Sequence, residues 1–182
     1  MVEKERTDMD FTDVILMRRT TRSYDSRQIN EADLNSMLMA AHMAPIAGAD
    51  YSKTHMTVVQ DSRLLDEIRQ ACTMKSKDAK PRDPLYGAPT VIFFSAHGVS
   101  KDYIEYSNIG CAIENVLLAA TNLDLGSTYI WGCLRRLRQH TGLIEKLGMP
   151  NGYVILSAVA VGYPMEPLAQ RSPAKNLSVD II

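Results

Sequence analysis

The stretch Tyr153-Val-Ile-Leu-Ser-Ala-Val-Ala-Val-Gly162 decides the class of fold that this chain adopts. Its apolar residues follow one another without alternation, which is typical of a strand that is buried on both faces. The stretch Thr90-Val-Ile-Phe-Phe-Ser-Ala96 is β-branched and aromatic and predicts a second buried strand. We expect two further core strands, over His55–Gln60 and Ser127–Cys133.

Stretches with helical spacing of apolar residues separate these strands. They lie over Phe11–Arg19, Asn30–Met43, Ser62–Cys72, from Ser107 or Asn108 to Leu123, and in one or two pieces over Leu134–Leu147. The fourth is apolar nearly all round, which is typical of a central helix. The alternation of helices with four strands predicts one α/β layered domain over residues 1–182, with residues 1–10 as a flexible N-terminus.

Composition argues against several classes of protein. The chain has 20 basic and 21 acidic side chains, whereas a nucleic-acid-binding protein usually has a clear basic excess. The longest apolar stretch is shorter than the roughly 18 residues of a membrane span, and the charged N-terminus lacks the apolar part of a secretory signal. Three widely spaced cysteines fit a reduced protein. We therefore expect no nucleic acid, no membrane and a cytoplasmic location.

The common motifs of nucleotide-binding and hydrolytic enzymes are missing. The chain has no Gly-x-Gly-x-x-Gly after a strand and no Gly-x-x-x-x-Gly-Lys-[Ser/Thr]. It has no His-Glu-x-x-His, Cys-x-x-Cys or Gly-x-Ser-x-Gly either, and its four histidines are scattered. We therefore expect no metal site.

The basic stretch Arg18-Arg-Thr-Thr-Arg22 is the strongest candidate for a binding site. Its three guanidinium groups and two hydroxyl groups can converge on a phosphate or an anionic ring edge, because arginine forms forked, charge-assisted hydrogen bonds. The alternative is a solvated cluster of charges. A second basic run, Arg135-Arg-Leu-Arg138, is interpreted as a solvated helix face, with nucleic-acid or partner binding as the alternative.

These residues resemble the opening of the FMN-dependent nitroreductase-like flavoproteins. Arg18-Arg-Thr-Thr-Arg-Ser-Tyr24 and a helix that ends in Ala44-Pro45 are similar to the family's Arg-Arg-Ser-x-Arg-x-Phe, helix and Ala-Pro-Ser. Further stretches resemble family motifs in the family's order: Tyr86-Gly-Ala-Pro-Thr-Val-Ile-Phe93, Ile109–Ala120, Leu123–Ile130 and Val161-Gly-Tyr-Pro164. The resemblance covers about residues 11–182.

The resemblance implies a three-layer α/β (α+β) fold, with a central mixed sheet flanked by helices and a C-terminal arm that extends onto a partner chain. It implies a homodimer with FMN at the interface, in sites lined by both chains. It also implies an oxidoreductase that reduces nitroaromatic, quinone or similar electron-poor acceptors with NADH or NADPH by a ping-pong mechanism. No catalytic side chain is expected, because the flavin carries the chemistry.

Residues of the basic stretch that match the family's motifs would contact FMN. Arg18 and Arg22 would contact the phosphate, the ribityl chain or the pyrimidine edge. Arg19 and Thr20 would hold the same end. Near the end of the chain, either Arg171 or Lys175 would reach the phosphate.

Other matching residues would meet the flavin ring. Pro45, Ile46 and Ala47 would lie near the isoalloxazine at the dimer seam. The backbone around Trp131 and Gly132 would approach the ring face opposite the nicotinamide site.

The loop after Pro45 departs from the family. The family's Ala-Pro-Ser-x-x-Asn-x-Gln-Pro-Trp reads here Ala44-Pro-Ile-Ala-Gly-Ala-Asp-Tyr-Ser-Lys53. Ile46 replaces the serine, and Ala49 replaces the asparagine that in the family hydrogen-bonds the flavin. Those hydrogen bonds must then come from the backbone, from water or from another residue. The departure motivates an alternative function, a non-catalytic flavin- or small-ligand-binding protein of the same fold.

The chain is also short for the family and lacks the helical insertion that covers the active site in larger members. Its Lys75–Leu85 stretch carries four basic residues. This stretch is either a cover that attracts the phosphates of NAD(P)H or an ordinary solvated loop.

Overall fold

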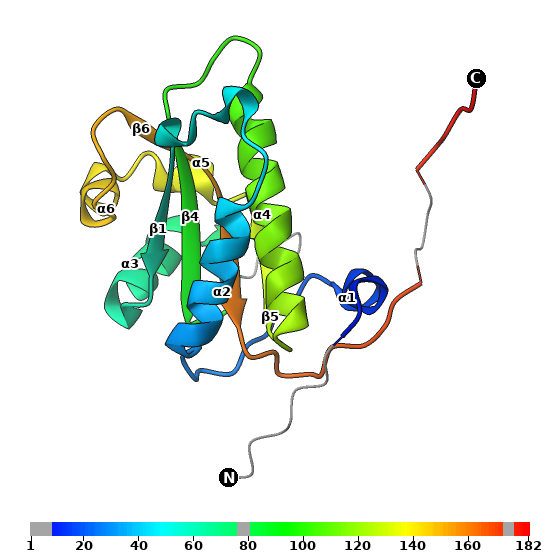
Figure 1. Ribbon diagram of the computed structural model, residues 1–182. Coiled ribbons are helices and arrows are strands. Elements are labelled where there is room, and N and C mark those ends of the chain that lie inside the picture. Colours follow the sequence, from blue (N-terminus) through cyan, green and yellow to red (C-terminus); the bar gives the residue numbers. More distant parts are fainter. Residues whose placement is uncertain (1–8, 76–80, 173–176) are drawn as a thin grey trace.

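The computed structural model describes residues 9–75, 81–172 and 177–182 (Figure 1). Its centre is a sheet with the strand order β1 (Thr54–Val59), β4 (Thr90–His97), β6 (Tyr153–Gly162) and β5 (Gly126–Ile130). Each neighbouring pair is antiparallel, so the named strands do not form the mixed sheet that we expected. The parallel pairing in the described residues is an isolated bridge between Thr20 and Ser127.

Helices cover both faces of this sheet, and successive strand residues point to opposite faces. On one face, α2 (Glu31–His42) and α4 (Ile104–Asn122) pack over Phe94. On the other face, α3 (Ser62–Cys72), α5 (Leu134–Leu137) and α6 (Thr141–Lys146) pack on the side of Phe93. The buried rings of Phe93 and Phe94 each contribute roughly 2–3 kcal/mol to the stability of the fold. The expected three-layer fold is confirmed, with one apolar core on each side of the sheet.

The shorter elements lie around these layers. They are α1 (Phe11–Met17), η1 (Ala47–Ala49), η2 (Tyr51–Lys53), and the pair β2 (Met74–Lys75) and β3 (Pro81–Arg82). Apart from Met74, the last pair falls within the Lys75–Leu85 stretch that we expected to be a loop or a cover, and residues 76–80 of that stretch lie outside the described residues. Residues 1–8 of the expected N-terminus lie outside them as well. Residues 177–182 form no helix or strand, and their apolar side chains are exposed.

The central helix α4 begins earlier than the sequence indicates. Ser107 and Asn108 are favourable capping residues, but the helix starts at Ile104, after Tyr103 with a φ of 59°. The Glu105 carboxylate accepts hydrogen bonds from the backbone N–H and the hydroxyl of Ser100 at 3.0 and 2.8 Å, which ties the first turn to the preceding loop. Within the described ranges no helix, α4 included, has both the length and the apolar character needed to cross a membrane.

Candidate cofactor site

The basic stretch is fastened to the edge of the sheet where β5 begins and β6 ends. The Thr21 N–H donates a hydrogen bond to the Ser127 carbonyl at 2.9 Å. The Met165 N–H donates to the Ser23 carbonyl at 3.1 Å. These bonds hold the backbone on both sides of Arg22, so the Arg22 side chain projects from a fixed point.

Two glycines allow this close approach. Gly126 and Gly162 are cross-strand partners in β5 and β6. A Cβ on Gly126 would lie 2.6 Å from Thr21 Cγ2, and a Cβ on Gly162 would lie 2.7 Å from Pro89 Cδ and 3.1 Å from Tyr24 Cδ1. Larger residues would force the packed neighbours apart. Sequence reasoning did not assign either glycine to the site.

Tyr24 supplies a buried anchor beneath the basic stretch. Its hydroxyl lies within hydrogen-bonding distance of the Thr21 carbonyl, Thr128 Oγ1 and the Ala160 carbonyl. Burial raises the pKa of Tyr24 well above its ordinary value, so the hydroxyl stays protonated. The sequence motif includes Tyr24, but nothing local in the sequence indicates these partners.

Arg19, Thr20 and Arg22 line one pocket of about 250 Å³, together with the segment Met165–Leu168. All three side chains are exposed. Among the described residues, neither Arg19 nor Arg22 forms an ion pair, and the Arg22 guanidinium lies 5.8 Å from the centre of the Tyr86 ring. The pocket also includes Glu166, so its charged lining is two arginines against one carboxylate.

Arg18 and Arg171 lie beside this pocket. Arg18 is turned toward α4, where its Nε lies 3.7 Å from Glu114 Oε1. Arg171 donates from Nε to the Arg18 carbonyl at 2.6 Å, and its backbone N–H donates to the Leu16 carbonyl at 3.0 Å. The structure therefore places Arg171 next to the basic stretch, whereas Lys175 lies outside the described residues.

Pro45, Ile46 and Ala47 follow α2 and lie near the start of α4. The Ala47 N–H donates to Asn108 Oδ1 at 3.0 Å, which fastens this segment to α4. Pro45 and Ala47 are exposed, and Ile46 is half-buried. The hydrogen bond that Asn108 accepts from Ala47 is a site feature that sequence reasoning missed.

Trp131 and Gly132 lie beyond β5 and not within it, although the sequence predicts a strand through Cys133. The chain turns here, because the Leu134 N–H donates to the Trp131 carbonyl at 3.2 Å. The Trp131 ring is 53% exposed, and its centre lies 5.6 Å from that of Tyr106 in α4.

One chain does not bring all the expected site residues together. Thr20 pairs with Ser127 at the start of β5, and Trp131 follows Ser127 by four residues. At the rise of a strand, about 13 Å of chain separates Ser127 from Trp131. In Figure 1, α1 and the basic stretch after it lie near the lower end of α4, and the loop after α2 lies near its upper end. The expected residues thus form two groups: a basic group (Arg18, Arg19, Thr20, Arg22, Arg171) and a ring group (Pro45, Ile46, Ala47, Trp131, Gly132).

The described residues hold no cluster for a metal ion, and two of the three cysteines are buried. In the described part of the chain, no three His, Cys, Asp or Glu residues are placed to hold a metal ion. Burial raises the pKa of the Cys133 thiol to about 12 and also raises that of Cys72. Both groups therefore stay as unreactive thiols near neutral pH.

Comparison with known proteins identifies this architecture. The model of the nitroreductase family matches residues 15–163. A protein of Archaeoglobus fulgidus, whose name gives NADH dehydrogenase/NAD(P)H nitroreductase as its proposed activity, is 33% identical over 156 residues, or 84% of each chain.

Solved structures agree with this match. A nitroreductase of Bacteroides fragilis with bound FMN is 30% identical and has a TM-score of 0.79, over 96% of this chain and 99% of that one. An FMN-dependent nitroreductase of Clostridium difficile is 26% identical with a TM-score of 0.75, over 97% and 100% of the two chains. The fold is thus that of the nitroreductase class of α+β proteins. The chain belongs to the nitroreductase family and is an oxidoreductase.

Proposed function

We propose that this chain binds FMN and uses NADH or NADPH to reduce nitroaromatic compounds, quinones or similar electron-poor acceptors by a ping-pong mechanism. Its membership of the nitroreductase family supports the proposal, as do the relatives whose names include FMN and NAD(P)H. The observation that carries it is the pocket in which Arg19, Thr20 and Arg22 converge, with Arg171 beside it.

The residues of the basic group suit the phosphate end of FMN. A phosphate monoester carries about −1.5 to −2 charges at pH 7. Arg19 and Arg22 bring forked donors that no carboxylate of the described residues engages, and Thr20 adds a hydroxyl. Arg18 and Arg171 add positive charge at the same end of the site.

Bound FMN would supply the hydride and electron transfer, and the chain supplies orientation and electrostatics. The hydrogen bonds around Thr21 and Tyr24 hold the basic group at a fixed place before any ligand arrives. The exposed Trp131 and the Pro45–Ala47 segment offer the apolar surface against which a flat ring can pack.

We also propose that the working unit is a homodimer whose sites each take the basic group of one chain and the ring group of the other. The separation of the two groups along α4 supports this arrangement, because a two-fold axis can join halves that one chain keeps apart. Exposed apolar residues accompany both halves, such as Phe11 at 72% and Met43 at 70%. The last sixteen residues, the polar tail with its apolar end, are the proposed arm on the partner, and the proposed location is the cytoplasm.

The test is reconstitution with FMN followed by anaerobic reduction. Protein incubated with excess FMN and passed through a desalting column should stay yellow and should release FMN on denaturation. NADH or NADPH should bleach the flavin without oxygen, and a quinone should restore the colour. A colourless protein would overturn FMN binding. A yellow protein that neither nicotinamide bleaches would instead support the non-catalytic flavin-binding alternative.

A further inference from the structure

Tyr86 has a backbone conformation that bulky residues rarely adopt. Its φ is 57°, in the left-handed region that glycine enters without strain, and the following Gly87 has a φ of 76°. Backbone strain of this kind persists only where surrounding contacts hold it, and it gathers at functional positions. We therefore looked for a gain that the tyrosine side chain brings and that a glycine at this position would not bring.

The turn that carries this tyrosine is held in place from both sides. The Asp83 carboxylate accepts hydrogen bonds from the backbone N–H groups of Leu85 and Gly87 at 2.8 and 2.6 Å. Arg69 of α3 lies with its Nε 3.5 Å from Asp83 Oδ2 and donates from Nη2 to the Ala88 carbonyl at 2.7 Å. Leu85 and Ala88 are themselves buried. The tyrosine ring between them therefore projects from a fixed backbone.

This ring lies over the guanidinium group of Arg22. Its centre is 5.8 Å from Arg22 Cζ, which is within the range of a cation–π contact. Arg22 lines the pocket of the basic group together with Arg19 and Thr20. Among the described residues, the Arg22 guanidinium forms no ion pair and no hydrogen bond. The ring face thus holds this side chain without occupying any of its N–H donors.

A second arginine–tyrosine contact in the chain is different. The Arg27 guanidinium lies 4.6 Å from the centre of the Tyr163 ring, but Arg27 Nε also lies 3.0 Å from Asp25 Oδ2. The charge of Arg27 is therefore already paired, whereas the charge of Arg22 is available to an anion. This difference makes Tyr163 a matched comparison for Tyr86.

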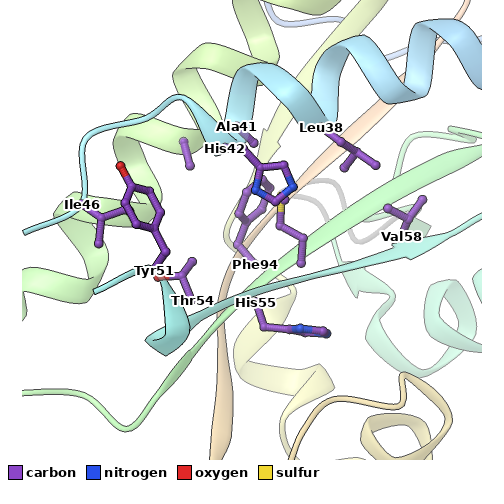
Figure 2. A pocket seen from close by; sticks show the side chains of 11 residues that line it. Leu38, Ala41, His42, Ile46, Tyr51, Thr54, His55, Val58 and Phe94 are labelled. Atoms are coloured by element: carbon purple, nitrogen blue, oxygen red, sulfur yellow. The ribbon is translucent and has the colours of Figure 1, made fainter. Parts of the chain in front are cut away.

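A larger cavity elsewhere lacks the charge that an anion needs. It lies beside His42, between α2 and β1, and has a volume of about 380 Å³ (Figure 2). None of the described residues that line it is a lysine or an arginine. A phosphate placed there would lose water without gaining a counter-charge. We therefore expect an anion to bind at the pocket of Arg22.

We propose that Tyr86 is a positioning residue of the cofactor site. Its ring holds the Arg22 guanidinium in place before the ligand arrives and leaves the forked donors free for a phosphate. A carboxylate in the same place would hold the arginine by neutralising it. The strained turn at Tyr86 is then kept for the ring that it presents. The effect on FMN rests on the proposed function, whereas the contact between Tyr86 and Arg22 does not.

Three variants separate the ring from the rest of the turn. Tyr86→Leu removes the ring face but keeps an apolar side chain on the same backbone, and Tyr86→Phe keeps the ring. Tyr163→Leu removes the ring beside Arg27. In flavin-free wild-type protein, nuclear Overhauser effects should join the Tyr86 ring to the Arg22 methylene protons. NMR relaxation of Arg22 Nε should show a more mobile side chain in Tyr86→Leu and no change in the other two variants.

FMN titration then tests the positioning role. Tyr86→Leu should weaken FMN binding by about two- to fivefold, and Tyr86→Phe and Tyr163→Leu should bind FMN as the wild type does. In an Arg22→Ala background, Tyr86→Leu should cause no further loss, because a positioning residue acts through its arginine.

Several results would overturn the inference. They are equal losses from Tyr86→Leu in the two backgrounds, an equal loss in Tyr163→Leu, or a wild-type spectrum in which Arg22 has no contact with the Tyr86 ring. A wild-type protein that retains no FMN but shows this contact would overturn the proposed function and leave the contact in place.

Discussion

The hydroxyl of Tyr24 lies 2.9 Å from Oγ1 of Thr128, although 104 residues separate the two in the sequence. The same hydroxyl lies 2.9 Å from the Thr21 carbonyl oxygen and 3.3 Å from that of Ala160. One buried group therefore joins the basic stretch to β5 and to β6.

Replacing Tyr24 by Phe should loosen the basic stretch without emptying the space that the ring fills. We expect a loss of about 1 kcal/mol in the free energy of unfolding, because buried hydrogen bonds disappear. The affinity for FMN should also fall. Urea unfolding and FMN titration measure the two effects, with Tyr129→Phe as the exposed control on β5. Unchanged FMN affinity in a less stable Y24F protein would show that the hydroxyl serves stability alone.

Gly126→Ala tests the close approach of the basic stretch to β5. The new Cβ would meet Thr21 Cγ2 at 2.6 Å, so we expect a destabilisation of about 1–3 kcal/mol and weaker FMN retention. The matched control is Gly110→Ala in α4, where no atom lies within 4 Å of the added methyl group. That variant should be as stable as the wild type or up to about 1 kcal/mol more stable. Equal thermal unfolding of the two variants would contradict the packing argument.

Arg22→Ala tests the assignment of the basic group to the FMN phosphate. Loss of a charge-assisted hydrogen bond should weaken FMN binding by about tenfold or more. Arg135→Ala, an exposed arginine of α5, should not change it. FMN fluorescence titrations at two salt concentrations measure the effect, since salt screens the exposed charges. If both variants bind FMN as the wild type does, the assignment is wrong.

Ala49→Asn should stabilise the loop after Pro45, which departs from the family. Ala49 has a φ of 52°, a left-handed conformation that asparagine adopts more readily than alanine. We expect a gain of about 0.5 kcal/mol in the free energy of unfolding. The new amide would also restore a side-chain donor beside the ring group. Ala47→Asn, two residues earlier in the same loop, is the control and should bring no gain in thermal unfolding.

The two buried thiols predict that the free energy of unfolding depends on pH under alkaline conditions. Burial raises the pKa of Cys133 to about 12, above its ordinary value of 9.0, and raises that of Cys72. The unfolded chain therefore ionises these thiols at a lower pH than the folded chain, and their contribution to stability is present below pH 9 and is lost as the pH rises toward 12. Urea unfolding at a series of pH values between 9 and 12 measures this loss of stability. Replacing Cys133 by Ala should flatten the dependence.

Local patterns were enough to predict the layers. The continuous apolar runs of β4 and β6 indicate strands covered on both faces, and Phe93 and Phe94 indeed lie in opposite cores. The predicted bounds of α3, Ser62–Cys72, are those of the structure. The predicted start of α4, at Ser107 or Asn108, was wrong. The contacts between Glu105 and Ser100 at the observed start follow no capping pattern.

The sequence predicted less of the candidate site than of the fold. The motifs indicated Arg19, Thr20 and Arg22, which do share a pocket. They could not indicate that Arg18 turns toward Glu114, because that choice depends on how α1 packs on α4. The cavity beside His42 combines side chains from α2, β1, β4 and α4, and no spacing along the chain encodes such a space.

The position of α4 between the two groups has a genetic consequence for the proposed homodimer. A chain with Arg22→Ala is damaged in one half of each site, and a chain with Asn108→Leu, which releases Ala47, is damaged in the other half. Each variant alone would have two defective sites. A mixed dimer would gather both defects in one site and leave the second intact, so coexpression of the two impaired chains would recover activity by intragenic complementation.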